Sequence, residues 1–456
     1  MRFSSRLAAA CGSLALMGCD IDVTDLNNPG LESIASSPTR SSVVTATTGL
    51  LVGARNGWTG TAGYISVMGI FGRESYILTT DDPRFVTELL IGPLDGGSFG
   101  GGQYLGRYAN IRNANIVLDA VPKVAALSDE EKAGITGFTK TIQAYDLLLV
   151  IGTRDAFGAP IDVNIPPTGK PAPIATRDET YARIIQLLDE ANTELGNAGG
   201  SFAFPLSDGF DGFDTPATFR QFNRGLRARV ALYLGEHATA LTALAASFLD
   251  TAAPMSLGVY HSFGNASGDA TNGSYDPTGR ALRGHPSFHA DAQLRPGGGM
   301  DLRAAAKQST TTPNSEVQGI SSPKLVTVFS SPTSPAAIMR NEELILMRAE
   351  AYIGLNQLAN AVSDLNVVRT VSGGLAPYAG AQTQAALIDE LLYNRRYSLY
   401  FEGHRWIDMR RFDRLATLPR DLPSHRVFTA MPFPRDECLA RSNPPQVPCT
   451  LLPGQP

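Results

Sequence analysis

The segment Asn394-Arg-Arg-Tyr-Ser-Leu-Tyr-Phe-Glu-Gly-His-Arg-Trp-Ile-Asp-Met-Arg-Arg-Phe412 says more about the fold than any other part of the chain. In it and just before it, apolar residues recur at spacings near three, four and seven, as on one buried helix face. Charged residues three apart fall in the same stretch and could pair along a helix. Gly403 would let another backbone approach closely, at a helix-propensity cost of about 1 kcal/mol. We expect a buried helix that locks neighbouring elements together, with apolar positions Leu387, Leu391, Leu392, Leu399, Trp406 and Met409 and ion pairs Glu402–Arg405, Arg405–Asp408 and Asp408–Arg411. A catalytic role for Glu402, His404 and Asp408 is the alternative.

The other end of the chain has the pattern of a secretory signal. Arg2 and Arg6 precede a run of small and apolar residues through Leu16. Leu16-Met-Gly-Cys19 then resembles a lipobox, in which the cysteine of a bacterial lipoprotein is acylated and becomes the new N-terminus. No apolar stretch reaches the roughly 20 residues of a spanning helix. We expect residues 1–18 to be a lipoprotein signal peptide, Cys19 to be lipidated, and residues 19–40 to tether the protein to a membrane that it does not cross. An ordinary cleaved signal with a chance cysteine is the alternative.

Cys438 and Cys449 would be the cysteines left in the folded body, since Cys11 leaves with the signal and Cys19 takes the lipid. Two thiols close in sequence in an exported protein are a reasonable disulfide pair. Such a bond would pin the Pro-rich tail, residues 416–456, and contribute on the order of 2 to 3 kcal/mol. Two further ligands are not near these cysteines, so we expect no metal site.

Composition narrows the class of protein. The net charge of −5 provides no basic surface for nucleic acid. Forty-five glycines and thirty prolines imply many loops, but with 43% hydrophobic residues the chain is not disordered.

Helical patterns come in groups along the rest of the chain. Ser128-Asp-Glu-Glu131 has the form of a capping box and introduces one of them. Several helices follow one another as pairs with alanines at close-contact positions, as in tetratricopeptide-like arrays. The expected helices cover residues 104–121, 128–152, 178–195, 218–234, 237–249, 341–354 and 358–371. Their irregular spacing predicts a helical scaffold, about 104–250 and 338–415, and no regular solenoid.

These segments and the 394–412 motif together resemble the SusD/RagB family, surface lipoproteins that bind nutrients beside an outer-membrane transporter. The motif residues that carry the resemblance are Arg395, Phe401, Glu402, Gly403, Arg405, Trp406 and Asp408; Asn394 and Ser398 stand where the family usually carries glutamates. The other matching segments are Tyr108-x-x-Ile111-x-Asn113-Ala114-Asn115, Ala144-Tyr145-Asp146-Leu147 with Gly158-Ala-Pro160, Ala228-Arg229-Val230-x-Leu232-Tyr233, Glu343-Leu-Ile-Leu-Met-Arg-Ala-Glu-Ala351 with Leu365-Asn366-x-x-Arg369, and Pro432-Phe-Pro434 with Asn443-Pro444. The resemblance implies a mainly α, SusD-like fold: residues 41–456 as one domain, with a scaffold of four tetratricopeptide-like hairpins and a large irregular loop region on one side.

Two long stretches rich in Gly, Ser, Thr, Asn and Asp, residues 53–102 and 254–335, are the candidates for that loop region and for ligand binding. Sugar rings stack their C–H faces on aromatic side chains, and their hydroxyls need amide, carboxylate or Arg partners. The alternative for each aromatic residue is packing of its loop onto the scaffold. Our candidate ligand contacts are Trp58, Tyr64, Arg73, Tyr76, Asp81 and Asp82 from the first stretch, and Tyr260, Tyr275, Arg283 and Arg303 from the second. With two tryptophans in all, one of them in the 394–412 motif, a starch-like ligand is disfavoured and peptides remain open.

Signals of catalysis are weak. Gly96-Gly-Ser98-Phe-Gly100 matches the nucleophile-elbow pattern, which needs a strand before it and a helix directly after; here it lies in a run of glycines. His285 and His289 are four apart, but Pro286 disfavours the helix that would align them on a metal. Asp81 and Asp82 are adjacent and, in an extended segment, would point to opposite faces. We expect no catalytic residue, metal or cofactor.

The function that follows by resemblance is capture of an oligosaccharide or peptide at the cell surface. The protein would be held in the outer membrane by its lipid and would act as a lid on a SusC-like, TonB-dependent transporter, its partner. The alternatives are a helical scaffold that binds only proteins, and a secreted hydrolase that uses Ser98, Asp81 or Asp82.

Overall fold

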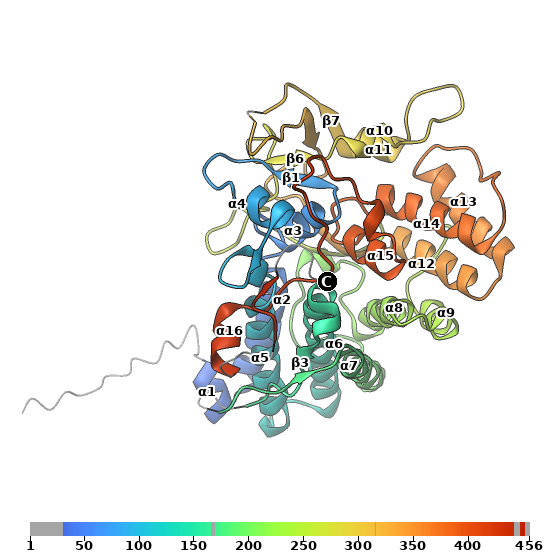
Figure 1. Ribbon diagram of the computed structural model, residues 1–456. Coiled ribbons are helices and arrows are strands. Elements are labelled where there is room, and N and C mark those ends of the chain that lie inside the picture. The colour runs from blue at the N-terminus through green and yellow to red at the C-terminus, as the bar shows by residue number, and fades with distance from the viewer. Residues whose placement is uncertain (1–30, 166–168, 315, 442–446, 452–456) are drawn as a thin grey trace, which may run out of the picture.

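A computed structural model describes residues 31–165, 169–314, 316–441 and 447–451. The expected signal peptide, the lipidation site Cys19, most of the tether and the segment Asn443-Pro444 lie outside these residues. Helices dominate, with short strands between them (Figure 1). The α-helices are α1 Leu31–Ser36, α2 Arg40–Arg55, α3 Tyr64–Phe71, α4 Arg84–Val86, α5 Leu105–Ala120, α6 Asp129–Arg154, α7 Arg177–Asn197, α8 Pro216–Tyr233, α9 His237–Ala245, α10 Ser287–Ala290, α11 Leu302–Lys307, α12 Asn341–Gly354, α13 Leu358–Val371, α14 Gln384–Ser398, α15 Arg405–Arg411 and α16 Arg435–Arg441.

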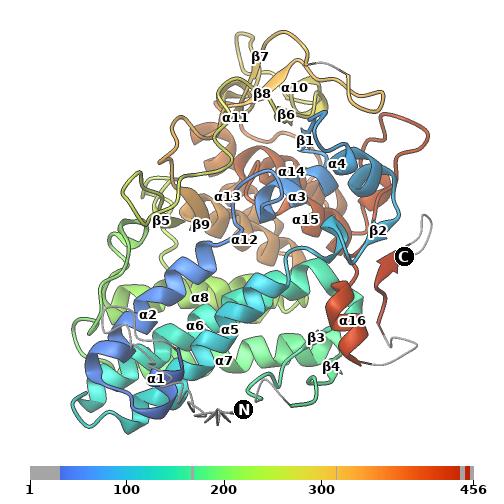
Figure 2. The same ribbon diagram turned by 90° about the vertical axis from the view of Figure 1, so that its left-hand side faces the viewer.

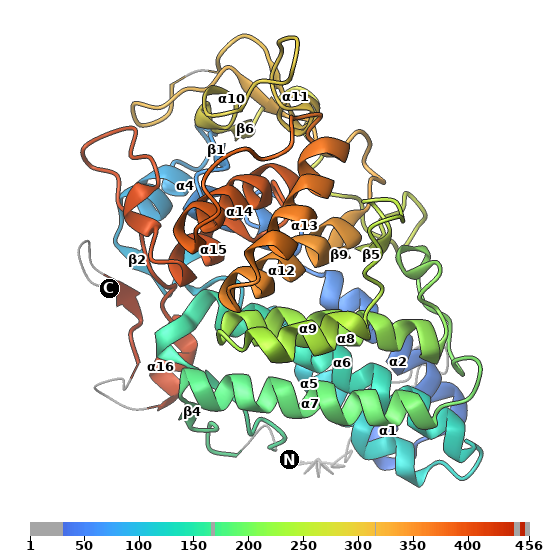
Figure 3. The same ribbon diagram turned by 90° about the vertical axis from the view of Figure 1, so that its right-hand side faces the viewer.

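Helix pairs form the scaffold. α6 packs along α7, α8 along α9, and α12 along α13, while α2 and α5 lie together on the other side of α6 (Figures 2 and 3). Contacts of α7 with α8 and of α9 with α12 join one pair to the next. The mainly α scaffold of helix pairs predicted from the sequence is therefore confirmed.

Local sequence accounts for many helix ends. Ser128 caps α6 as predicted, because its hydroxyl accepts a hydrogen bond from the backbone N–H of Glu131 at 3.2 Å and the Glu131 carboxylate accepts one from the backbone N–H of Ser128 at 3.0 Å. The predicted bounds of α12 and α13 agree with the structure. α6 runs past the predicted end to Arg154, and α9 stops at Ala245, before the predicted end.

Several elements have no counterpart in the sequence prediction. α2 and α3 belong to the scaffold, and α3 lies inside the expected loop 53–102. α3 is buried along its whole length, so it carries no polar face for sequence periodicity to reveal. α1 begins inside the segment that we expected to be tether.

Buried ion pairs join elements that are distant in sequence. Arg229 of α8 and Glu343 of α12 are 2.7 Å apart, and Arg107 of α5 and Asp146 of α6 are 3.2 Å apart. All four side chains are buried, so removing one partner would leave an uncompensated charge in the core.

The 394–412 segment is two helices and not the single helix we predicted. α14 ends at Ser398, and α15 begins at Arg405. Between them Phe401 and Gly403 have φ of 62° and 84°, in the left-handed region that ends helices. Gly403 is needed there also because a Cβ would lie 2.7 Å from the Tyr64 ring. A side chain, rather than a second backbone, makes the close approach.

The ion pairs of this segment differ accordingly. Asp408 pairs with Arg411 at 3.0 Å, as predicted, and also with Arg395 of α14 at 2.7 Å. Glu402 is bound by Arg340 at 2.6 Å, and Arg405 donates to the carbonyl of Leu392, so the predicted pairs Glu402–Arg405 and Arg405–Asp408 are wrong. Glu402 lies in the break between the helices, and Asp408 of α15 is already paired with Arg395 and Arg411. The segment still locks elements together, as expected.

Most strands lie on the loop side or in the C-terminal tail, while β3 and β4 lie between α6 and α7 in the chain. β1, β6, β8 and β7 form an antiparallel sheet in that order, β5 pairs with β9, β3 with β4, and β2 with β10. A disulfide joins Cys438 of α16 to Cys449, just before β10, and so holds the tail against β2. The strand bounds are β1 Ser75–Ile77, β2 Leu94–Asp95, β3 Ala159–Pro160, β4 Ile174–Ala175, β5 Gly258–His261, β6 Leu282–Gly284, β7 Gln308–Thr310, β8 Lys324–Val326, β9 Ala336–Arg340 and β10 Thr450–Leu451.

Among the residues described, no helix combines the length and the apolar character needed to span a bilayer.

Candidate functional site

The two predicted loop regions meet at one edge of the four-stranded sheet. β1, from the first region, pairs with β6, from the second, in the register Ser75 with Gly284 and Ile77 with Leu282. The pairing continues as the backbone N–H of Leu78 donates to the carbonyl of Ala281 at 2.8 Å. The chain that leaves β1 and the chain that enters β6 are therefore side by side, at the top of the molecule in Figure 1.

A polar groove of about 530 Å³ opens at this junction, within the size range of small-molecule sites. One side is the segment after β1, another the turn before β6, and a third the loop before β8. The groove is lined by Leu78, Thr79, Thr80, Asp81, Asp276, Arg280, Ala281, Asn314 and Val317. We call it the loop groove.

Asp276 shapes the turn before β6. Its carboxylate accepts hydrogen bonds from the backbone N–H groups of Arg280, Ala281 and Leu282 at 2.9 to 3.1 Å. Burial opposes ionisation of Asp276, but these hydrogen bonds outweigh it and lower the pKa of the carboxyl group. An ionised Asp276 thus holds the turn rigid and places Arg280 at the groove.

The other polar groups of the loop groove face solvent. Asp81 and Arg280 are exposed, and the Arg280 guanidinium makes no hydrogen bond or ion pair with the residues that the structure describes. The amide oxygen of Asn314 accepts from the backbone N–H of Ser322 at 2.9 Å, which orients its side chain. Carboxylate, guanidinium, amide and hydroxyl groups together can bind a ligand rich in hydroxyl groups.

Of the ten predicted ligand contacts, Asp81 lines the loop groove. Asp82 is tied to Arg84 at 2.7 Å, and Tyr275 is half-buried against the core. Tyr260 is also half-buried, and its hydroxyl donates to the carbonyl of Ser256. None of these three lines the groove, although Asp82 and Tyr275 are next in sequence to the lining residues Asp81 and Asp276.

Six predicted contacts are buried, and we assign them to packing instead. Trp58 and Tyr64 stack on each other with ring centroids 4.9 Å apart. Arg73 donates to the carbonyls of Pro419 and Arg426, and Tyr76 donates to Asp421 at 2.8 Å. Arg283 donates to the carbonyl of Gly279 at 2.7 Å, and Arg303 pairs with Asp301 at 2.6 Å. The polar groups of Arg73, Tyr76, Arg283 and Arg303 already have partners inside the protein, which hold the loops on the scaffold.

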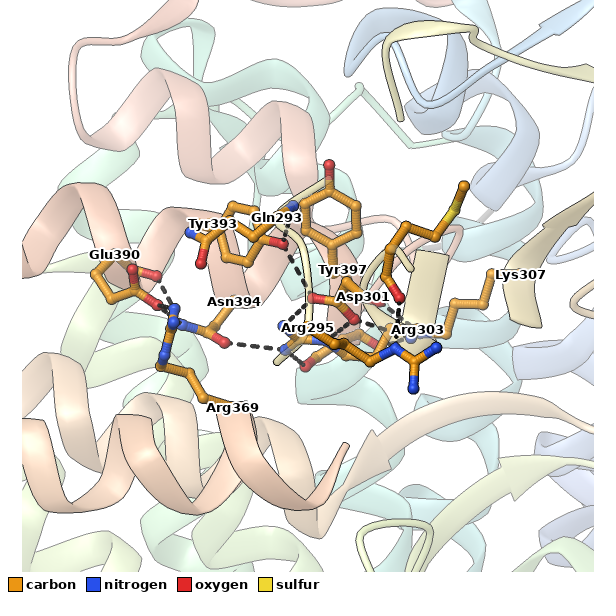
Figure 4. A network of polar contacts seen from close by, with 12 residues as sticks. Gln293, Arg295, Asp301, Arg303, Lys307, Arg369, Glu390, Tyr393, Asn394 and Tyr397 are labelled. Atoms are coloured by element: carbon orange, nitrogen blue, oxygen red, sulfur yellow. Dashed lines mark hydrogen bonds and ion pairs between the residues drawn. The ribbon is translucent and has the colours of Figure 1, made fainter. Parts of the chain in front are cut away.

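Figure 4 shows the network around Arg303. Arg303 pairs with Asp301 at 2.6 Å and donates to Asn394 and Ser398 at 3.0 Å each. At the two positions where the family usually carries glutamates, this chain therefore uses neutral acceptors, and Asp301 supplies the carboxylate. The network continues from Asn394 to Glu390 and from there to Arg369.

The weak catalytic signals have structural explanations. The Ser98 hydroxyl accepts from Arg84 at 3.3 Å, and Arg84 is a cation that cannot act as a base. The glycines around Ser98 allow close backbone contact: a Cβ on Gly96 would lie 2.2 Å from the carbonyl oxygen of Phe433 in the tail. His285 and His289 have separate partners, Asp421 at 3.3 Å and the carbonyl of Ala304 at 3.1 Å.

Sequence reasoning missed Asp276, Arg280 and Asn314. Asp276-Pro-Thr-Gly279 has the composition of a tight turn, which is the one local signal available. Its place beside Asp81 depends on the pairing of β1 with β6, which no local pattern encodes.

Comparisons with known proteins agree on the fold. A SusD superfamily protein from Bacteroides vulgatus aligns with a TM-score of 0.68 and 18% identity over 92% of this chain and 99% of its own. A SusD-like carbohydrate binding protein from Bacteroides fragilis aligns with a TM-score of 0.68 and 14% identity over 90% of this chain and 99% of its own. A laminarin binding SusD-like protein aligns with a TM-score of 0.61 and 17% identity over 87% of this chain and 97% of its own.

No curated protein sequence matches this chain significantly. Residues 303–437, which include the whole 394–412 motif, match the family model of the SusD family. The helical scaffold, the loop side and the closing motif all agree with the SusD-like fold, and residues 303–437 are similar in sequence to the SusD family.

Proposed function

We propose that this protein is a cell-surface lipoprotein of the outer membrane that binds an oligosaccharide in the loop groove. It then delivers the ligand, chemically unchanged, to a SusC-like, TonB-dependent transporter. The observation that carries the binding role is the groove itself, where Asp81, Arg280 and Asn314 from separate loops line one space. The laminarin binding and carbohydrate binding relatives of the same fold support a sugar ligand.

The chemistry of the groove favours an oligosaccharide over a peptide. Its lining contains two hydroxyls, two carboxylates, one guanidinium and one amide, but no aromatic ring. Such groups match sugar hydroxyls, whereas peptide side chains are recognised by apolar pockets between the polar contacts. The absence of stacking rings from this lining predicts modest affinity.

Calorimetry with an oligosaccharide panel, including laminarin oligomers, tests the site. Asp81→Asn removes a charged acceptor from the groove and should weaken binding about tenfold, since a hydrogen bond to a charged group contributes roughly 1.5 to 3 kcal/mol. Asp82→Asn is the matched control, because that neighbouring carboxylate pairs with Arg84 and does not line the groove. Equal loss in both variants, or none in Asp81→Asn, would place the ligand elsewhere.

A pull-down tests the lipid anchor and the delivery role. The tagged protein is recovered from detergent-solubilised outer membrane, and its N-terminus and partners are identified by mass spectrometry. We expect a lipidated Cys19 and a TonB-dependent barrel in stoichiometric amount. Recovery of the protein alone, from a membrane where it is abundant, would overturn the delivery role and leave a free-standing binding protein.

A further inference from the structure

A second cavity lies on the scaffold, away from the loop groove. It is bordered by α5, by residues 160–165 and 169–172, and by α16, which lie together in the lower part of Figure 2. Its volume is about 330 Å³. The lining residues used below are Tyr104, Tyr108, Arg112, Pro160, Glu437 and Arg441. We call it the scaffold cavity.

One face of α5 forms the floor of this cavity. Tyr108 and Arg112 are four apart and so lie above one another on the helix, and Tyr104 directly precedes it. The Tyr108 hydroxyl donates to the carbonyl of Pro160 at 2.8 Å, and the Tyr104 ring packs against the Tyr108 ring with centroids 4.5 Å apart. Tyr108 is half-buried, and its fixed ring gives the cavity a rigid apolar surface.

The wall opposite α5 is rigid and electrically balanced. Glu437 and Arg441 of α16 form an ion pair, with Arg441 Nε 2.9 Å from the carboxylate. Arg441 also donates to the carbonyl of Ala172 at 2.5 Å, and the Cys438–Cys449 disulfide holds α16 in place. The negative charge of Glu437 is thus neutralised inside the wall.

Arg112 is the positive charge that remains. It is exposed at the cavity and has no hydrogen bond or ion pair with any described residue. A guanidinium binds a carboxylate through two parallel hydrogen bonds, so this end of the cavity is suited to an anion.

A buried acceptor lies in a neighbouring cavity. A smaller cavity of about 100 Å³ shares Tyr108 and Pro160 with the scaffold cavity and extends to Gln143 of α6. Gln143 is 5% exposed, and its side-chain oxygen has no hydrogen-bond partner in the part of the chain that is described. A buried acceptor without a partner costs about 1 to 3 kcal/mol, which a hydroxyl of a bound ligand would recover.

We propose that the scaffold cavity is a second binding site, for a sugar that carries a carboxylate, that is, a uronic-acid residue. Its carboxylate pairs with Arg112, its C–H face lies on the Tyr108 ring, and one of its hydroxyls donates to Gln143. A peptide C-terminus shares the carboxylate but does not bring an array of hydroxyls. This site is independent of the loop groove and of the ligand proposed there.

Calorimetry on the full chain in detergent tests the proposal, with digalacturonate and its neutral counterpart digalactose as probes. Digalacturonate should bind at least tenfold more tightly than digalactose. Arg112→Gln should abolish that preference, and Arg112→Lys should keep part of it, because lysine retains the charge but not the paired donors. Arg220→Gln is the matched control: Arg220 of α8 is also exposed but does not line the cavity, so its loss should change nothing.

Equal binding of the two disaccharides, or an unchanged preference in Arg112→Gln, would overturn the proposal. So would an equal loss in Arg220→Gln, or no binding of digalacturonate up to about 10 mM, a free energy of roughly −3 kcal/mol. A tripeptide with a free C-terminal carboxylate is a further probe. If it binds, while the same tripeptide with an amidated C-terminus and digalacturonate do not, the sugar assignment is rejected. Asp81→Asn should leave the preference for digalacturonate over digalactose unchanged, so failure of either site is distinguished from failure of the other.

Discussion

Asp408→Asn should destabilise the fold strongly, because Asp408 joins two arginines inside the protein. The carboxylate is 1% exposed and lies 2.7 Å from Arg395 and 3.0 Å from Arg411. Burial opposes its charge, but the two guanidinium groups outweigh that effect and lower its pKa from 3.8 to about 2. Asparagine keeps the shape of the side chain and removes the charge, so Arg395 is left buried without its partner.

Two arguments give the size of the effect. A pKa lowered from 3.8 to about 2 corresponds to about 2 to 3 kcal/mol of stabilisation. Removal of one partner from a buried ion pair typically costs about 3 to 5 kcal/mol. We therefore expect a loss of about 3 kcal/mol at pH 7.

The pH dependence of this loss has a definite sign. The folded-state pKa of Asp408 is depressed, so its contribution is present above the unfolded pKa and disappears as the pH falls towards about 2. The difference between wild type and Asp408→Asn should shrink between about pH 4 and pH 2.

Urea denaturation followed by circular dichroism measures the difference in unfolding free energy between the two proteins at pH 7 and between about pH 4 and pH 2. The comparison holds if the dependence of that free energy on urea concentration has the same slope in both proteins. Asp389→Asn is the control, because Asp389 forms an exposed pair with Arg414 at 3.6 Å, and such pairs contribute about 0 to 1 kcal/mol. If Asp408→Asn costs no more than Asp389→Asn, the attraction of the two arginines does not exceed the penalty of burying the charge, and our reasoning is refuted.

Two further perturbations test other parts of the fold. Burial raises the pKa of Glu74 to about 8 despite the attraction of Arg405. The stability that protonated Glu74 contributes is therefore fully present below the unfolded pKa and is lost as the pH rises through about 8. Glu74→Gln should raise the urea midpoint at pH 8 and change it little at pH 5, and an equal change at both pH values would contradict the assignment. Gly101→Ala would place a Cβ 2.1 Å from the carbonyl oxygen of Gly96 and should cost at least about 2 kcal/mol in the same assay. Gly106→Ala is the control, because a Cβ there would lie in open space on α5 and should stabilise the protein by up to about 1 kcal/mol. Similar effects of the two variants would show that the loop around Gly96 and Gly101 is not closely packed.

Features that depend on neighbours along the chain could be predicted well. The capping box at Ser128 and the bounds of α12 and α13 follow from side chains within a few residues of one another. The close pair Cys438 and Cys449 is joined in the structure by the disulfide that the exported-protein pattern suggested.

The 394–412 segment marks the limit of that reasoning. Its spacing indicated one helix, but the chain turns at Phe401 and Gly403, and the Tyr64 ring, from α3, occupies the space beside Gly403. Its charges find partners across the fold, such as Arg340 for Glu402, and not only three residues away. Periodicity records which residues are apolar and cannot record which distant ring or charge they meet.

The candidate site divides in the same way. The sequence by itself determined that residues 53–102 and 254–335 are rich in loop-forming residues and that Asp81, in the first of them, is a candidate ligand contact, because composition and turn chemistry are local. Only the tertiary structure decided that Asp276 and Arg280 join Asp81, that Trp58, Tyr64, Arg73, Tyr76, Arg283 and Arg303 are used for packing, and that Arg112 is left without a partner. Those outcomes depend on strand pairing and side-chain burial between segments far apart in the chain, where the free energy of contact, and not local propensity, selects the neighbour.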